Sequence, residues 1–203
     1  MKVEKEKKVN IPSLQIKTVR ITLEGLSPLL VHRFSEKAKT EIAEKQQKKA
    51  KNAKAARDPH QEYLSSLYVL PGSKKKPVYG IPTAGIKNAA VSACRFVDGF
   101  PMSKAMGAFH VLEEAEGLTP IEGTPVLDER MVRIGPFGRK VATPRYRGRF
   151  DKWKVTFDVQ YNESVISSEQ LVHLFDTAGF AIGLCEHRPE KRGSLGRFQV
   201  ARQ

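Results

Sequence analysis

Residues 152–161 are the most constraining stretch of the sequence, because their side chains alternate in polarity. One face carries Val155, Phe157, Val159 and Tyr161, and the other carries Lys154, Thr156, Asp158 and Gln160. A period of two is typical of a strand with one buried face. The capping-box pattern at Ser167 and Gln170 then predicts a helix to about Phe180. Together they predict an α+β fold, in which helices cover one face of an antiparallel sheet.

The remaining elements are predicted from periodicity and from turn or cap residues. Helices are expected over Ser35–Arg57, Thr83–Val97 and Ser103–Glu114. Strands are expected over Leu14–Glu24, Val78–Ile81, Val126–Ile134 and Arg197–Ala201. The segment His60–Leu70 fits either a short helix or a strand, and the sequence leaves this open.

The composition indicates one soluble domain with a polyanionic partner. The chain has 203 residues and a net charge of +13, and no apolar run reaches the ~20 residues of a membrane span. Two cysteines form no disulfide framework, so we expect a cytoplasmic protein with reduced thiols and no membrane partner. We assign residues 1–12 to a flexible tail and residues 13–203 to a single domain.

The positive charge is concentrated in blocks. Residues 130–154 hold nine Lys or Arg against one acid, and predict a basic hairpin. Residues 35–77 predict an inserted basic clamp, whereas residues 112–129 are acidic. Blocks of opposite sign suit self-association or contacts with other subunits, and basic blocks suit nucleic acid.

A glycine-rich basic segment, residues 179–200, predicts a phosphate site. Glycines let the backbone approach a ligand, and successive N–H groups can form a concavity for an anion. The alternative is a solvated hairpin. Upstream, the strand-to-helix stretch Tyr79–Arg95 offers a second anion site at a helix N-terminus near Lys87, although ordinary helix packing explains its alanines better.

These two stretches resemble the RAMP superfamily of CRISPR-associated RNA-binding proteins. The similar segments are the strand-to-helix run Ile81–Ala90, the C-terminal run Ser194–Phe198 and the strand exit Leu26–Arg33. Asn88 stands where the family commonly has glycine, and Cys185–His187 departs from its loop pattern. The resemblance covers about a quarter of the chain, and it fits backbone subunits of effector complexes better than processing nucleases.

The resemblance implies a ferredoxin-like, RRM-like fold and a non-catalytic subunit that binds single-stranded nucleic acid, preferably RNA, as a multimer or complex subunit. The C-terminal pattern also resembles phage-encoded proteins, which would allow DNA as the ligand and a host cytoplasm as the location. No cofactor or metal is expected. The predicted contacts to nucleic acid are His32, Arg33, Lys87, Arg95, Arg139, Arg145, Arg147, Arg149, Arg188, Lys191, Arg192, Gly193, Ser194, Gly196 and Arg197.

Two other functions remain open. His32 follows the first strand, near where the related processing ribonucleases can place a general base, and Arg33 and His60 could join it, so the resemblance leaves metal-independent RNA cleavage open. Asp58 before Pro59 fits a turn former. A RAMP-like subunit or mimic that binds proteins of a CRISPR or phage complex is the third possibility.

Aromatic side chains within the basic block could stack on bases. They are Phe137, Tyr146, Phe150 and Trp153, and for Trp153 we favour a place in the core.

Overall fold

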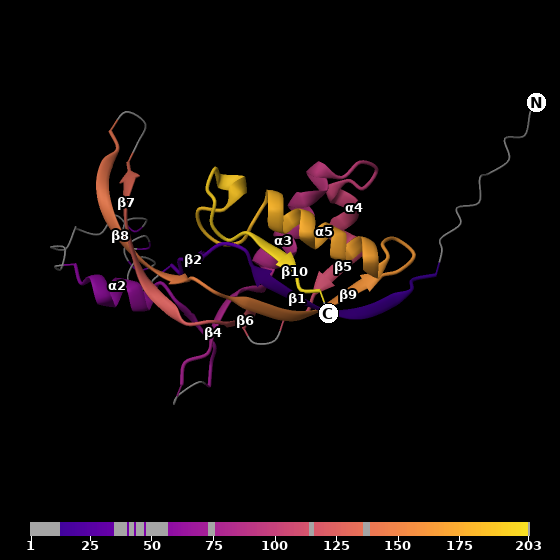
Figure 1. The fold of residues 1–203 in the computed structure, drawn as a ribbon, viewed down its shortest axis with the longest axis horizontal. Coiled ribbons are helices and arrows are strands. Elements are labelled where there is room, and N and C mark those ends of the chain that lie inside the picture. The colour runs from indigo at the N-terminus through magenta and orange to yellow at the C-terminus, as the bar shows by residue number, and fades with distance from the viewer. Residues whose placement is uncertain are drawn as a thin grey trace, which may run out of the picture.

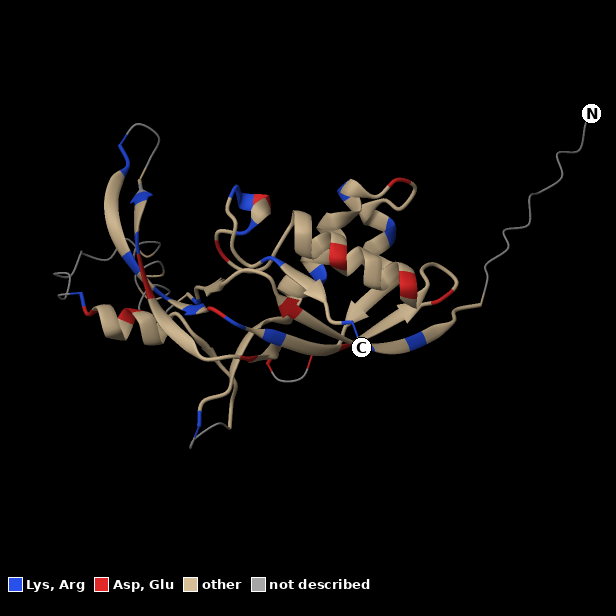
Figure 2. Cartoon of the chain, in the orientation of Figure 1, with Lys and Arg blue, Asp and Glu red and all other residues tan. Residues whose placement is uncertain are grey.

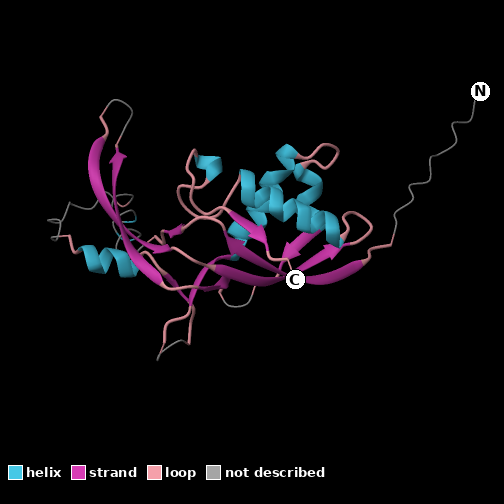
Figure 3. Cartoon of the chain, in the orientation of Figure 1, coloured by secondary structure: helices cyan, strands magenta, loops and turns pink. Residues whose placement is uncertain are grey.

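The computed structural model describes residues 13–34, 57–72, 76–113, 116–135 and 139–202, together with positions 40, 43 and 47. Within these ranges the chain builds two antiparallel sheets and a group of helices (Figures 1 and 3). Helices α3, α4 and α5 lie over one face of the larger sheet, and the long strands β7 and β8 project beside α2 (Figure 1). The predicted α+β class with antiparallel sheets is therefore confirmed.

The larger sheet has seven strands. Six pair in the order β10 (Phe198–Val200), β1 (Ile16–Gly25), β9 (Lys154–Asn162), β6 (Leu118–Glu122), β4 (Tyr79–Pro82) and β3 (Tyr68–Val69), and β5 (Phe109–Val111) also pairs with β9. The order β10-β1-β9-β5 is joined by two crossover helices, α3 (Thr83–Ala93) between β1 and β5, and α5 (Ser168–Ala181) between β9 and β10. Along the chain these elements run β-α-β-β-α-β.

Strand β9 has the predicted alternation. Its four apolar side chains are all at most 4% exposed and face the helices, whereas Lys154 and Gln160 are exposed. Phe157 and Phe175 of α5 lie with ring centroids 5.6 Å apart. Burial of this apolar face between sheet and helices holds the layers together.

Both crossover helices follow their sequence signals. Ser167 Oγ accepts from the Gln170 N–H while the Gln170 side chain accepts from the Ser167 N–H, so the predicted capping box is confirmed. Helix α3 begins at Thr83 directly after β4, and Ile86, Ala89 and Ala90 are buried. It ends at Ala93 and continues as the 3-10 turn η1 (Cys94–Phe96), so the expected helix to Val97 is shorter than predicted.

The predicted helix over Ser103–Glu114 is wrong in its second half. Helix α4 (Met102–Ala108) ends where β5 begins. Phe109 and Val111 point into the core while His110 is exposed, and all three pair with β9. Pairing with the central strand outweighs the helical pattern of the preceding residues.

The smaller sheet pairs β2 (Leu29–Val31), β8 (Val141–Phe150) and β7 (Pro125–Ile134). Strands β7 and β8 pair antiparallel within the region of the basic hairpin expected over residues 130–154, although no separate strand was predicted over Val141–Phe150. Helix α2 (Pro59–Ser65) packs against β8, and Asp58 is its N-cap, accepting from the N–H groups of His60 and Gln61. Most of the predicted helix over residues 35–57 lies outside the described residues, as do parts of the clamp over 35–77.

No helix among the described residues is both long enough and apolar enough to cross a membrane.

Candidate nucleic-acid interface

A pocket of about 230 Å³ lies where four segments meet. These segments are the end of β2 at His32, strand β3 at Tyr68, one side of α3, and the loop that follows α5. The loop spans residues 182–197 and contains the 3-10 turn η2 (Pro189–Lys191). The pocket therefore joins the three sequence segments that were singled out separately.

The loop over residues 182–197 is held by its own backbone. The N–H of Gly193 donates to Arg188 O, that of Leu195 to His187 O, and that of Gly196 to Pro28 O. The N–H groups of Gly193 and Gly196 already have acceptors, so in this fold they are not available to form the phosphate concavity that the loop was expected to provide. Of the residues 193–196, Ser194 is the one whose N–H has no acceptor within the described chain.

The loop glycines are required by close packing. A Cβ on Gly193 would lie 1.7 Å from His187 O, and one on Gly196 would lie 2.0 Å from Leu184 O. Gly196 also has a φ of 67°, which glycine adopts at little cost. The glycine spacing thus reflects a tightly folded loop rather than an open cradle.

Glu186 connects the loop to the smaller sheet. Its Oε1 accepts from His32 Nδ1 at 3.1 Å, and its Oε2 lies 2.5 Å from Nη1 of Arg147 on β8. The hydrogen bond from His32 and the charge of Arg147 outweigh burial and lower the pKa of the Glu186 carboxyl. Arg147 is 5% exposed, and neither its Nε nor its Nη1 has a partner in hydrogen-bond geometry. The ion pair with Glu186 is therefore the main compensation for a buried charge.

A second carboxylate, Glu190, binds two of the predicted phosphate ligands. Arg95 donates to its Oε1 at 2.6 Å, and Arg188 donates to its Oε2 at 2.8 Å. Burial alone would raise the pKa of Glu190, but these hydrogen bonds lower it. Arg95 and Arg188 are thus brought to the pocket already paired with an acid.

Three other predicted basic residues stand at the loop without an acid partner in the described chain. Lys191 and Arg192 are exposed on and beside η2, and Arg197 lies 5.5 Å from the centre of the exposed Phe180 ring. Figure 2 shows basic residues both on this loop and on the β7–β8 pair. These cations are available for an anion.

Arginines line one face of the β7–β8 pair, because Arg145, Arg147 and Arg149 are two residues apart. Asp128 on β7 binds Arg149 Nη1 at 3.1 Å and Arg130 Nε at 2.7 Å. Arg130 stands directly opposite Arg145, which has no acid partner among the described residues. Like charges directly opposite each other are destabilising, so this face is suited to an added anion. The Arg147–Glu186 contact shows that it faces the loop.

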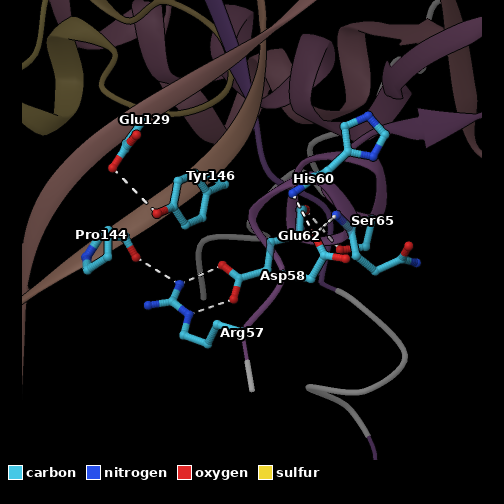
Figure 4. Close-up of polar contacts among 9 residues, drawn as sticks. Arg57, Asp58, His60, Glu62, Ser65, Glu129, Pro144 and Tyr146 are labelled. Atoms are coloured by element: carbon cyan, nitrogen blue, oxygen red, sulfur yellow. Dashed lines mark hydrogen bonds and ion pairs between the residues drawn. The ribbon is translucent and has the colours of Figure 1, made fainter. Parts of the chain in front are cut away.

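The opposite face of β8 is fastened to α2 (Figure 4). Arg57 forms a two-pronged ion pair with Glu62 and donates to Pro144 O at 2.8 Å, and its guanidinium lies 5.8 Å from the centre of the Tyr146 ring. Tyr146 in turn donates to Glu129 Oε1 at 3.4 Å. Helix α2 therefore covers the face of β8 opposite to the arginines.

Not every predicted contact lies at the pocket. Lys87 on α3 reaches His110 on β5, with Nζ 3.2 Å from Nδ1. Arg139 is exposed just before β8 begins. Phe150 and Trp153 are at most 3% exposed, so their rings cannot stack on bases, and the core position favoured for Trp153 is confirmed. Phe137 lies outside the described residues.

Several residues at the site were missed from the sequence. Phe34 is 65% exposed, and its ring is nearly parallel to that of His32, with the centroids 6.4 Å apart. Tyr68, Asn88 and Glu186 line the pocket. A lone aromatic, amide or acid carries no periodic signal, so only the tertiary contacts identify these residues.

The sheet face turned away from the helices is less suited to nucleic acid. Arg20 and Asp158 form a two-pronged ion pair there at 2.8 and 2.9 Å, and Lys154 pairs with Glu24. The outward positions of β1 and β9 carry no aromatic side chain between Thr18 and Glu24 or between Lys154 and Gln160. RNA recognition on an RRM sheet uses stacked aromatics on this face.

Metal and thiol chemistry receive no support from the described residues. No group of three or more His, Cys, Asp or Glu side chains could hold a metal ion there. Burial raises the pKa of the Cys185 thiol to about 12, so this sulfur is a poor nucleophile at neutral pH.

Comparisons with known proteins found similarity at the level of chain path. No protein-family model matches, and no curated protein matches. The crystal structure of Cmr6 from Pyrococcus furiosus aligns with a TM-score of 0.47 and 12% identity, over 93% of this chain and 100% of that one. A chain of the Type III-B Cmr-beta complex bound to cognate target RNA aligns with a TM-score of 0.47 and 12% identity, over 92% of this chain and 59% of that one. A Cas6 product complex aligns with a TM-score of 0.30 and 11% identity, over 90% and 50% of the two chains.

Proposed function

We propose that this protein is a non-catalytic subunit that binds single-stranded nucleic acid along its phosphate backbone, with RNA as the preferred ligand. The β-α-β-β-α-β order of the core fits a ferredoxin-like domain of RAMP type, and the preference for RNA comes from the sequence resemblance. In this proposal the nucleic-acid strand lies between the arginine face of β8 and the loop over residues 182–197.

One observation carries this proposal. Arg130 and Arg145 are held directly opposite each other on the face that Arg147 joins to the loop. On the loop beside the pocket, Lys191 and Arg192 are exposed and, like Arg145, have no acid partner in the described chain, whereas Arg130 pairs with Asp128. An anion between these groups relieves the repulsion and neutralises both sides.

The distribution of the basic groups matches phosphates spaced along single-stranded nucleic acid better than it matches one small anion. The basic groups lie on two elements, β8 and the loop, whereas Glu186 and Glu190 line the pocket beside the loop. A flexible strand can place successive phosphates on either side of these carboxylates, and a small anion cannot.

A fluorescence-anisotropy titration with labelled RNA and DNA strands at two salt concentrations tests the proposal. We expect binding with little sequence preference, tighter for RNA, and weakening steeply with salt because bound phosphates release counterions. Binding that does not depend on salt would contradict a phosphate contact. Absence of binding to any oligonucleotide would favour a protein-interaction role, which pull-down after nuclease treatment then measures.

We further propose that copies of the subunit associate along the strand. Within the acidic stretch over residues 112–129, Asp128 already pairs with Arg130 and Arg149 of the arginine face. Glu113, Glu116 and Glu122 are exposed, so one copy can offer these acids to the arginine face of its neighbour. Light scattering with and without a long RNA strand measures this, and a monomer on a strand long enough for several copies would contradict it.

RNA cleavage is the second candidate function, and the His32–Glu186 contact favours it. Because Glu186 occupies Nδ1, the neutral imidazole keeps Nε2 as an acceptor, as a general base requires. Metal-independent products from labelled hairpin RNA that disappear in His32→Ala would support cleavage. Intact RNA with the wild-type protein at equal binding would exclude it.

A further inference from the structure

The phosphate contacts proposed above leave the pocket beside the loop unoccupied. Its size and its lining indicate which ligand it could hold. Its volume is about 230 Å³, below the ~300–1,000 Å³ typical of sites for drug-sized ligands. Such a space holds a single small ring system, and it is too small for a peptide segment or a stack of bases.

The lining combines apolar walls with polar side chains, three of which have no hydrogen-bond partner among the described residues. Ile81, Ala89 and Leu184 contribute apolar surface. The side chains of Tyr68, Asn88 and Ser92 also line the pocket, and none of them makes a hydrogen bond within the described part of the chain. A nucleobase is a flat ring with apolar faces and with donors and acceptors along its edge, so it matches this distribution.

The charges in the wall favour a base over a phosphate. Glu186 and Glu190 both line the pocket with lowered pKa values, against the single guanidinium of Arg188. Because these carboxylates already pair with Arg147, Arg95 and Arg188, the lining residues offer no free Lys or Arg to a phosphate, and a neutral base needs none. The cations Lys191, Arg192 and Arg197, which do suit phosphate, stand on the loop around the pocket and do not line it.

We propose that this pocket takes one nucleobase that is turned out of the stack of the bound strand. The inference rests on the proposed function, because the strand delivers the base. Asn88 and Ser92 contact the edge of the base from α3, Tyr68 contacts it from β3, and His32 offers Nε2. The exposed Phe34 beside His32 gives an adjacent base a surface for stacking. A base inside a duplex is stacked and paired, so the pocket selects single strands.

Gly85 allows the pocket to be blocked without disturbing the fold. It lies on α3 and lines the pocket, and a Cβ placed there meets nothing within 4 Å. The variant Gly85→Leu therefore adds a side chain to open space and removes a helix glycine, which favours folding. Gly107→Leu is the matched control, because Gly107 lies on α4, also has no atom within 4 Å of its Cβ, and does not line the pocket.

The test compares two labelled strands of about 16 nucleotides, one with bases and one with abasic sites throughout. We expect the wild-type protein and Gly107→Leu to bind the strand with bases about tenfold or more tightly than the abasic strand. Gly85→Leu should bind both strands as weakly as the wild-type protein binds the abasic one. Asn88→Ala should weaken only the strand with bases, and thermal melts of each variant confirm folding.

The outcomes separate the two proposals. If the wild-type protein binds neither strand, the proposed function fails and the pocket proposal fails with it. If it binds both strands equally and Gly85→Leu does the same, phosphate binding stands and the base pocket is overturned. AMP, GMP, CMP and UMP serve as probes of a free ligand. Binding of one of them that Gly85→Leu abolishes, with unchanged affinity for the strand, would assign the pocket to a free nucleotide and overturn the proposal.

Discussion

Arg147 is the most heavily constrained charged residue of the site. Its side chain is 6% exposed, and Glu186 is its ion-pair partner at 2.5 Å. A buried guanidinium without a carboxylate costs far more than an exposed one, because it loses its hydration. Glu186 thus stabilises the junction between the loop and the smaller sheet and also orients His32.

Glu186→Gln should lower the free energy of unfolding at pH 7 by about 1–2 kcal/mol, because Arg147 loses its counter-charge. The loss is smaller than the ~3–5 kcal/mol of a fully buried pair, since the Glu186 side chain is 38% exposed and solvent screens it. Urea denaturation of both proteins measures the difference.

The pH dependence of that difference has a definite sign. The pKa of Glu186 is lower in the folded protein than its ordinary value of 4.5, so its contribution is complete above pH 4.5. The contribution is lost as the pH falls through the folded pKa, and the two unfolding free energies should converge there. Glu163→Gln, which removes a surface partner of Lys17, is the control and should change stability by less than about 0.5 kcal/mol. A difference that grows on acidification would contradict this role of Glu186.

At the scale of elements, the loop over residues 182–197 determines how the site is arranged. It carries Glu186 and Glu190 to one side and Lys191 and Arg192 to the other. Non-glycine residues Cys185, His187 and Arg192 adopt positive φ values of 58°, 52° and 62° in this short span. Such conformations persist where the surrounding contacts determine them, as the internal backbone hydrogen bonds do here.

Gly193→Ala should therefore destabilise the protein by about 2 kcal/mol, because the new Cβ would overlap the backbone oxygen of His187 and force the loop to move. Nucleic-acid affinity should fall with it, since Lys191 and Arg192 would shift. Gly85→Ala is the comparison within the same protein, and it should be neutral or raise stability by about 0.5–1 kcal/mol. Thermal and urea unfolding measure both, and equal stability of the two variants would show that the loop is not tightly constrained.

At the scale of the whole molecule, the two sides of the protein differ in charge pairing. On the open sheet face Arg20 pairs with Asp158. The arginine face of β7–β8 also holds ion pairs to Asp128, but Arg145, opposite Arg130, has no acid partner among the described residues. Nucleic acid should therefore bind on the side of the loop and the arginine face.

Arg145→Gln should change stability and binding in opposite directions. Stability should rise by about 0.2–1 kcal/mol because the repulsion with Arg130 is removed. Affinity for single-stranded RNA should fall, and the slope of log affinity against log salt should become shallower by about 0.7 for one lost phosphate contact. Anisotropy at several salt concentrations measures both quantities.

Arg20→Gln is the control for the other face and should leave the affinity and the salt slope unchanged. If Arg20→Gln weakens binding and Arg145→Gln does not, nucleic acid binds on the open sheet face and the placement of the site is wrong.

Much of the fold could be predicted from the sequence because it depends on local patterns. The alternation in β9 and the capping box of α5 each indicate one element through burial or a cap. The same reasoning failed at Phe109–Val111, where three residues are too few to show a period and pairing with β9 decides their conformation. It placed β8 only within a basic hairpin expected over residues 130–154 and did not give the bounds of the strand.

The sequence by itself determined the α+β class and the excess of positive charge, because periodicity and composition are properties of the chain alone. Only the tertiary structure decided which charges remain available. Acids distant along the chain meet these basic residues in space, so Glu190 pairs with Arg95 and Glu186 with Arg147, while Lys191 and Arg192 remain exposed. The tertiary structure also decided the role of the glycines. The N–H groups of Gly193 and Gly196 donate to backbone carbonyls of the protein itself, and the pocket lies beside this loop, where no sequence pattern indicates it.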